Sequence, residues 1–407
     1  MKTLVVGGGP AGLFAAFSAS SRGDDVLLLE KNKIPGKKLL LTGEGRCNVT
    51  STLSPEGVLD NVFVARNFLY SALYSFSPMD TRKFFAKRGL KLKEERGRRL
   101  YPVTDRAESV RKVLVEAVRA AGGEILTGRE TVELIIDNKI EGVRTAGGDE
   151  YPADRVILAA GGSSYPSTGS DGSGFELARQ AGHRLHPRPR PALVPLKSEE
   201  EWLKSVAGLK LKNIELSLMA GEEVKFSDIG EVELREDEIG GSLGLLASCH
   251  YEESEEHDFR ILLDLKPGLS REKLDGRLQR DFSRYSNKMY KNVYQDLLPA
   301  WLRPVIVDMS GISPERRVHQ IDSEERRRIC QLLKNLEIFL SGTAGFKRAI
   351  ITAGGVDTDE IVPGSMASRI APGLFLAGEM LAPAAYTGGH NLQIAFSTGF
   401  LAGRAGD

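Results

Sequence analysis

Cysteine is scarce in this sequence of 407 residues: it has three, Cys47, Cys249 and Cys330, and they lie far apart. No Cys-x-x-Cys pair is present, and no histidine stands beside a cysteine at the spacing of metal ligands. This pattern disfavours a disulfide-stapled secreted domain, a zinc site and a dithiol redox centre of the disulfide-reductase kind. We therefore predict no bound metal.

An excess of charge of one sign and a long hydrophobic run are also missing. The 55 basic residues are balanced by 55 acidic ones, so nucleic acid is an unlikely partner except through a local patch. No stretch approaches the ~18–20 apolar residues that span a bilayer. Met1-Lys2-Thr3 leads directly into an apolar strand without the features of a signal peptide. We expect a cytoplasmic protein without a membrane span; the sequence does not determine its oligomeric state.

Glycine, in contrast, is abundant, with 44 residues. Its first cluster, Gly7-Gly8-Gly9-Pro10-Ala11-Gly12, follows an apolar run and precedes a helical segment of small residues, and a second apolar run ends at Glu30. This arrangement predicts a dinucleotide-binding Rossmann unit. Gly7 permits the tight turn, Gly9 allows the approach of a pyrophosphate, and Gly12 lets the helix lie close to the sheet. The helix start then suits phosphates, and Glu30 suits the hydroxyls of an adenosine ribose.

The next segment favours a flavin dinucleotide over NAD. Residues 31–50 read KNKIPGKKLLLTGEGRCNVT, a basic loop in which Gly43, Gly45, Arg46 and Asn48 stand close together. NAD-binding domains usually continue into another helix at this point, whereas such a loop suits the phosphates and ring of a flavin cofactor. Cys47 is either a small buried group or a flavin contact, and no neighbour in sequence activates its thiol.

The C-terminal segment predicts the other side of the same cofactor site. The apolar run 374–377 ends at Gly378-Glu379, and Gly388-Gly389-His390-Asn391 opens a helix. The carboxylate suits ribityl hydroxyls, and the helix start suits the N1–C2=O edge of a flavin. A third cluster, Gly161-Gly162, follows the strand 156–160 but lacks the Gly-x-Gly-x-x-Gly order. We therefore predict one dinucleotide-binding unit and not two.

These stretches resemble the BaiN/RdsA-type NAD(P)/FAD-dependent oxidoreductases, which belong to the wider glutathione-reductase-like FAD fold. The matching segments are GGGPAG with Glu30-Lys31, PGKKLLLTGEGRCNVT, LAAGGSSYPSTGSDGSG, PALVPL, ITAGGVDTDEI, GLFLAGEM and TGGHNLQIAFSTG. The resemblance implies FAD at Gly7, Gly9, Gly12, Glu30, Arg46, Asn48, Glu379, Gly389 and Asn391. The sequence departs from the family pattern at Ala382-Pro383-Ala384-Ala385, where members carry acidic residues, and at His390, where they carry an aromatic residue.

The predicted cofactor contacts extend beyond the positions that the resemblance implies, and no catalytic residue is identified. The full set is Gly7, Gly9, Pro10, Ala11, Gly12, Glu30, Lys31, Lys38, Gly43, Gly45, Arg46, Cys47, Asn48, Ala160, Gly161, Gly378, Glu379, Gly388, Gly389, His390, Asn391 and Leu392.

The predicted fold is α/β: a Rossmann-like FAD-binding domain with an inserted antiparallel, barrel-like β domain that carries a small helical subdomain. We expect the FAD-binding domain at 1–190 and 346–407, the β-rich insert at 191–266 and 306–345, and the helical insert at 267–305. A proline-rich crossing, LHPRPRPALVPL, marks the first boundary. Alternating apolar residues then indicate half-buried strands, and a helical period follows from Ser270.

The predicted function is that of an FAD-dependent oxidoreductase that takes hydride from NAD(P)H and passes it to an unsaturated small molecule. Two alternatives stay open: a flavin redox sensor without turnover, and an FAD-dependent RNA-modifying enzyme. Residues 82–99 carry nine basic side chains against Glu94 and Glu95, and form either a solvated surface or a phosphate-docking one. The segment lacks the alternation of basic and aromatic residues that would indicate base stacking on single-stranded nucleic acid.

Overall fold

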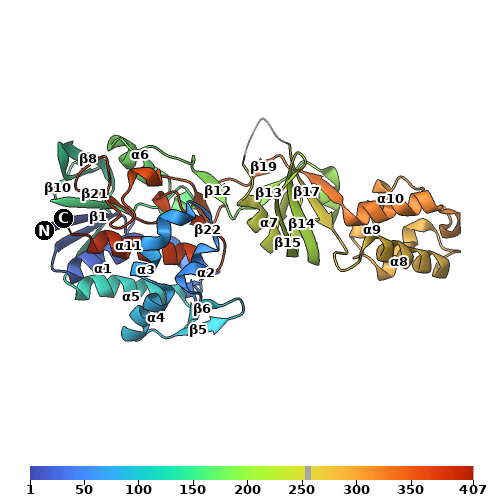
Figure 1. Ribbon diagram of the computed structural model, residues 1–407, viewed down its shortest axis with the longest axis horizontal. Coiled ribbons are helices and arrows are strands. Elements are labelled where there is room, and N and C mark those ends of the chain that lie inside the picture. Colours follow the sequence, from blue (N-terminus) through green and yellow to red (C-terminus); the bar gives the residue numbers. More distant parts are fainter. Residues whose placement is uncertain (253–257, 407) are drawn as a thin grey trace. The chain divides into compact units, whose positions relative to one another are not determined.

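The computed structural model describes residues 1–252 and 258–406 (Figure 1). The chain divides into two compact units, one formed by Met1–Ala192 with Phe346–Asp407 and the other by Leu193–Gly345. Each unit has a hydrophobic core of its own. The first unit contains every residue that the sequence places at the cofactor.

The first unit is built on a five-stranded parallel sheet of order β21–β11–β1–β2–β7. Its strands are β1 (Lys2–Val6), β2 (Asp25–Glu30), β7 (Glu124–Thr127), β11 (Arg155–Leu158) and β21 (Leu374–Leu376). The central strands are continuous apolar runs because both faces of the sheet are covered. The predicted β–α–β unit is present as β1, α1 and β2, with its Gly-rich turn at the carboxyl end of β1, where ligands bind in folds of this type.

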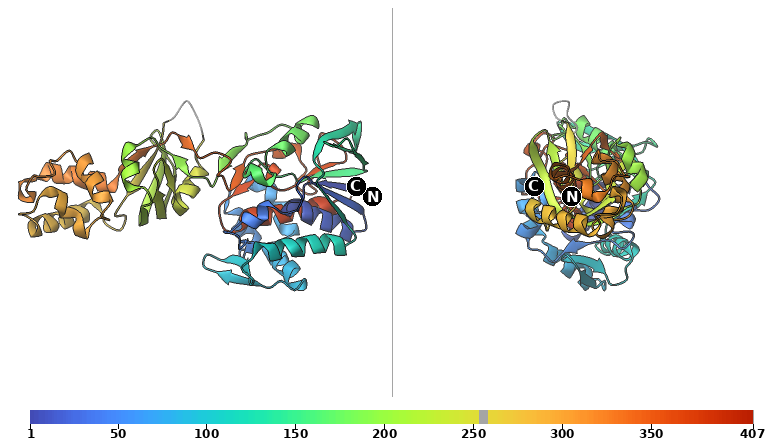
Figure 2. Two further views of the ribbon diagram at one scale, coloured as in Figure 1. Left: turned by 180° about the vertical axis from the view of Figure 1, so that it is seen from behind. Right: turned by 90° about the vertical axis from the view of Figure 1, so that its right-hand side faces the viewer.

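Helices cover one face of this sheet and a small β meander covers the other (Figures 1 and 2). The helices are α1 (Pro10–Ser21), α5 (Ala107–Ala120) and α11 (His390–Arg404); the meander is β8 (Thr131–Asp137), β9 (Lys139–Thr145) and β10 (Glu150–Pro152), beside α6 (Ser173–Gln180). The ends of the chain meet where α11 crosses α1. A Cβ on Gly399 would lie 2.2 Å from the carbonyl oxygen of Ala11, and a Cβ on Gly403 would lie 2.2 Å from that of Ala15. Glycine is therefore required at both positions for this close crossing.

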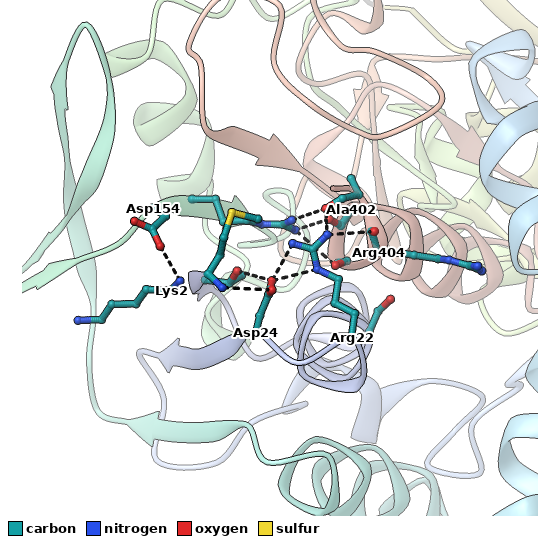
Figure 3. Close-up of polar contacts among 12 residues, drawn as sticks. Lys2, Arg22, Asp24, Asp154, Ala402 and Arg404 are labelled. Atoms are coloured by element: carbon teal, nitrogen blue, oxygen red, sulfur yellow. Dashed lines mark hydrogen bonds and ion pairs between the residues drawn. The ribbon is translucent and has the colours of Figure 1, made fainter. Parts of the chain in front are cut away.

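Two arginines bind the carboxyl end of α11. Arg155, which is almost fully buried, donates to the carbonyls of Ala402 and Ala405, and Arg22 donates to those of Arg404 and Ala405. Figure 3 shows Arg22 held in turn by Asp24, at 3.0 Å. The cationic groups satisfy carbonyls that have no partner within the helix and oppose the negative end of its dipole.

Short elements complete the first unit. They are α2 (Pro55–Leu59), α3 (Tyr70–Ser75), α4 (Pro78–Lys87), a sheet of β3 (Thr50–Ser51), β6 (Arg99–Pro102) and β5 (Leu92–Glu95), and the pairs β4 (Val62–Val64) with β22 (Ala384–Ala385) and β12 (Arg190–Ala192) with β20 (Ile351–Ala353).

The second unit contains an antiparallel sheet whose two ends are joined, which is the predicted barrel-like insert. Its strands are β13 (Leu196–Lys197), β14 (Lys210–Ala220), β15 (Glu223–Leu234), β16 (Glu238–Gly240), β17 (Phe259–Asp264), β18 (Leu336–Phe339) and β19 (Gly342–Thr343), with α7 (Gly241–Ser248) after β16. The run 336–343 pairs with β17 through its first half and with β13 through its second half. Between them, the amide of Leu340 donates to Phe259 and that of Ser341 to Lys197.

The predicted end of the helical insert at residue 305 is wrong. Helices α8 (Arg271–Arg284), α9 (Leu302–Met309) and α10 (Ser323–Lys334) pack together, so the helical part continues to residue 334. The predicted boundary falls inside α9. The proline at position 304 lies in the first turn of α9, where a missing N–H costs nothing, and therefore does not end the helix.

Candidate functional site

The turn between β1 and α1 has the geometry that its glycines predict. Gly7 adopts a left-handed φ of +103°, and a Cβ on Gly12 would lie 1.8 Å from the carbonyl oxygen of Gly7. Gly9 precedes α1 in an extended conformation, with nothing within 4 Å of the position that a Cβ would take. Pro10 stands at the first position of α1, followed by the buried Ala11, and no side chain caps this helix start. The amides at the start of α1 are thus available to an anion.

Glu30, at the end of β2, is buried and directed at this turn. Its Oε2 accepts from the amide of Gly8 at 2.8 Å, and its Oε1 accepts from the amide and the side chain of Asn32 at 2.7 and 2.6 Å. The carboxylate therefore holds the Gly-rich turn and keeps one acceptor site, on Oε2, for a further hydroxyl donor. Lys31 lies elsewhere, with its Nζ 2.8 Å from Asp171. The sequence offered no separate signal for Asn32.

Lys38 and Glu379 form the centre of a polar cluster, although they are far apart in sequence. Lys38 Nζ lies 2.6 Å from Glu379 Oε2 and 2.6 Å from Ser164 Oγ. Glu379 Oε1 also accepts from Ser164 Oγ and from the amide of Thr352, both at 2.8 Å. The cluster joins the loop after β2, the loop after β11, β20 and the end of β21. Ser164 and Thr352 were missed, since single hydroxyl side chains carry no sequence signal for such a contact.

The GEGRCN loop is divided between a buried and an exposed part. Cys47 is buried with a left-handed φ of 63°, and burial raises the pKa of its thiol to about 12, so the thiol is neutral and unreactive. Arg46 turns to the surface, where it pairs with Glu95 and Asp105. Asn48 Oδ1 is buried and finds no hydrogen-bond partner within the described residues. Gly43 and Gly45 both have left-handed backbone angles, which explains the glycines.

The start of α11 is formed by Gly388 and Gly389. Gly389 is the N-cap with φ +86°, no side chain caps the helix, and a Cβ there would lie 2.8 Å from the backbone of Thr50 in β3. The side chain of Asn391 exchanges two hydrogen bonds with the backbone of Ala385, at 3.0 and 2.7 Å. This side chain therefore fixes the loop before the helix. Leu392 is half-buried in the first turn.

His390 is a buried, neutral imidazole at the same helix start. Burial and the nearby charge of Arg99 lower its pKa to about 4. Its ring lies against Gly388, where a Cβ would come within 2.4 Å of Nε2. Its Nδ1 is buried and has no hydrogen-bond partner among the described residues. A neutral ring nitrogen without a partner is available to a ligand or to water.

The remaining predicted residues line the ends of two neighbouring strands. Ala160 and Gly161 follow β11, and Gly161 has a left-handed φ of +80°. Gly378 follows β21, and a Cβ there would lie 2.6 Å from the Cβ of Ala11. The ends of β1, β11 and β21 are adjacent in the sheet, so these residues meet beside the Gly-rich turn.

This arrangement fits FAD, the cofactor that the sequence predicts. Two uncapped helix starts supply amides for anionic groups, and Glu30 retains one acceptor site, on Oε2, beside the first of them. Two buried polar atoms have no hydrogen-bond partner among the described residues: Asn48 Oδ1 in the GEGRCN loop and His390 Nδ1 at the start of α11. Within 1–252 and 258–406 no cluster of acidic, His and Cys residues could hold a metal, and no helix is long and apolar enough to cross a membrane.

The family model described as the HI0933-like protein Rossmann domain matches residues 1–405. The chain is 34% identical over 411 aligned positions to the 3-dehydro-bile acid delta(4,6)-reductase of Clostridium scindens, with 98% of each chain covered. It is 26% identical to the ribosomal RNA dihydrouridine synthase of Escherichia coli, covering 97% of this chain and 95% of that one.

The fold is similar to that of a solved structure, the 3-ketosteroid delta1-dehydrogenase of Sterolibacterium denitrificans. The TM-score is 0.52 at 13% identity, with 99% of this chain and 98% of that chain covered, which shows a shared fold and no more. The chain thus belongs to the HI0933-like family of FAD-dependent oxidoreductases with a Rossmann-type FAD-binding fold.

Proposed function

We propose that the protein reduces a carbon–carbon double bond conjugated to a carbonyl group, with NAD(P)H as the electron donor. The reaction adds one hydride and one proton across the double bond and oxidises one NAD(P)H to NAD(P)⁺. The observation that carries this proposal is the full-length similarity to the reductase of C. scindens. Dihydrouridine formation, named for the more distant relatives, is chemically the same kind of step on a uracil ring.

The residues of the first unit have separate roles in holding FAD. The turn Gly7–Gly12 and the start of α1 take the pyrophosphate, and Glu30 takes the adenosine ribose. Glu379 faces the ribityl chain with Lys38 as its partner. The start of α11 would face the pyrimidine edge of the flavin. The bound flavin would supply the hydride chemistry. The amides of α11 oppose negative charge on that edge without a lysine or arginine between Gly378 and Gly403.

A direct hydride route is favoured because the cysteines are unsuited to relay electrons. All three cysteines are buried, and none of them forms a disulfide within the described residues; burial raises the pKa of the Cys47 and Cys330 thiols. With no dithiol beside the cofactor and one dinucleotide-binding unit, the nicotinamide serves as a transient donor and leaves after transfer. The buried and neutral Cys47 contributes volume rather than chemistry.

A second candidate is the same reduction on a uracil base in RNA. It is favoured by the two relatives named as ribosomal RNA dihydrouridine synthases. It is also favoured by a group of exposed cations within residues 82–99, close to the start of α11.

The experiment that tests the proposal measures product against nucleotide consumed. The FAD-loaded protein is incubated without oxygen with NADH or NADPH and either a conjugated steroid dienone or a uridine-containing RNA. We expect one saturated bond per nucleotide oxidised with one of the two substrate classes. Oxidation of nucleotide without a saturated product from either class would overturn the proposal.

A further inference from the structure

We propose that the β5–β6 hairpin, the adjoining helix α4 and the loop between them form a docking surface for the phosphate backbone of RNA, beside the start of α11. This basic surface is defined by six exposed cations: Arg82, Lys87, Lys91, Arg96, Arg98 and Arg99. The proposal rests on the second candidate function and specifies where its substrate is held.

The six cations have no acidic partner within the described residues, because the acids nearby are bound elsewhere. Asp80 accepts from Ser77 in the capping box of α4. Glu95 and Asp105 bind Arg46 and Lys93, and Glu94 accepts from Thr52. A local excess of positive charge thus stands on a chain whose formal net charge is zero. Such an excess costs free energy through self-repulsion unless an anion is bound.

The hairpin turn presents arginines at its tip. In the ladder between β5 and β6, the backbone of Glu95 lies opposite that of Arg99, so residues 96–98 form the loop of the hairpin. Gly97 and Arg98 both have left-handed backbone angles, with φ of 79° and 59°. Arginine is costly in this conformation, where glycine or asparagine is the usual choice, so its charge rather than its backbone preference explains its presence.

The basic surface is connected to the proposed active site by direct contacts within the first unit. Strand β6 pairs with β3, with Ser51 opposite Arg99 and Thr50 opposite Leu100. Thr50 packs in turn against Gly389 at the start of α11. The charge of Arg99 is close enough to lower the pKa of His390. An anionic chain bound along the hairpin would therefore pass beside the helix start that we assign to the flavin.

The chemistry of the surface fits a polyanion more closely than a dinucleotide. All six side chains are exposed and lie on the β5–β6 hairpin, on α4 and in the loop between them, whereas small ligands bind in concave sites that enclose most of their surface. Guanidinium groups bind phosphate oxygens in pairs. The tyrosine of the hairpin, Tyr101, is buried, so binding through phosphates and not through base stacking is expected. Binding should then depend little on sequence and strongly on salt.

The test is a salt titration of RNA binding with a doubly substituted hairpin. Full-length FAD-loaded protein is titrated into a fluorescent single-stranded RNA at several salt concentrations, and its anisotropy is recorded. The slope of the logarithm of the RNA association constant against the logarithm of the salt concentration is negative. In the Arg96→Gln/Arg98→Asn variant we expect it to become shallower by about 1.4, since each phosphate contact on a single strand contributes about 0.7. Asparagine tolerates the backbone of residue 98. The Arg96→Lys variant should keep most of the binding.

The control carries the same change of charge elsewhere on the first unit. Arg119 and Lys139 are exposed and have no acidic partner among the described residues, so Arg119→Gln/Lys139→Gln should leave the salt slope unchanged. Equal loss in this control would overturn the proposal, because bulk charge would then explain the binding. An unchanged slope in the hairpin variant, or a loss of NADPH affinity with RNA binding intact, would overturn it too. Anaerobic reduction of the flavin by NAD(P)H on the same preparations reports separately on the proposed function.

Discussion

At the scale of single residues, the glycines of the first turn serve either the fold or the ligand. Gly12 has no room for a side chain, whereas Gly9 has open space and an ordinary extended backbone. Gly12→Ala should therefore destabilise the protein by about 1–3 kcal/mol or more. Gly9→Ala should change stability by less than about 0.5 kcal/mol but weaken FAD binding about tenfold or more, because its Cβ enters the space assigned to the pyrophosphate. Urea unfolding and FAD titration measure both effects; Gly9→Ala with full FAD affinity would contradict the assignment.

His390 gives a prediction on pH. Its pKa falls from the ordinary value of 6.5 to about 4 on folding, so the unfolded state binds the proton more tightly. Stability contributed by the neutral ring is present above pH 6.5 and is lost as the pH falls toward 4, by about 3 kcal/mol in all. Urea unfolding of wild type and His390→Gln between pH 4 and 7 measures it. The free energy of unfolding of His390→Gln should fall less than that of wild type as the pH is lowered. Parallel curves of this free energy against pH would show that folding does not lower the pKa of the His390 ring.

At the scale of elements, helix α11 is held at both ends by different means. Its start rests on Gly389 against Thr50, and its end is bound by Arg155 and Arg22 (Figure 3). Gly389→Pro would collide with the Thr50 backbone, so a change in flavin potential in that variant would not isolate a lost amide. Variants in the carboxyl end of the helix test its packing without touching the cofactor site.

Arg155→Met should therefore be more damaging than Arg22→Met. Arg155 is buried, and its loss leaves the carbonyl of Ala402 without its cationic donor and that of Ala405 with Arg22 alone, at a cost of about 3 kcal/mol. Arg22 is about one-fifth exposed, so water replaces its hydrogen bonds and a loss of about 1 kcal/mol is expected. Chemical denaturation of the two variants gives the comparison. Equal effects would mean that the buried arginine is not the main support of the helix end.

The elements that the sequence predicted best are those with local signals. The turn Gly7–Gly12 and the apolar runs on either side identify β1, α1 and β2, and the alternation around Ile214 identifies β14. The partners of Glu379 were not predictable, because Lys38, Ser164 and Thr352 come from three distant segments. The closure of the barrel was hidden as well, since the run 336–343 changes partner between two short strands.

At the scale of the whole molecule, the two ends of the chain meet in the first unit, where they form the candidate cofactor site. The second unit is inserted between Ala192 and Phe346 and has its own core. We expected the FAD-binding domain at 1–190 and 346–407, and the first unit spans Met1–Ala192 and Phe346–Asp407. The helical part of the second unit continues beyond the expected end at residue 305. Helical periodicity continues through α10, but polar segments between the helices interrupt it, and only packing shows that they belong together.

We propose above all that this protein is an FAD enzyme that a nicotinamide nucleotide reduces. The most direct test is an anaerobic titration of the purified protein with NADH and with NADPH, followed by flavin absorbance. We expect a yellow protein whose released cofactor is FAD and whose flavin band bleaches with one equivalent of one of the two nucleotides. A colourless protein that takes up no added FAD, or a bound flavin that neither nucleotide bleaches, would contradict it.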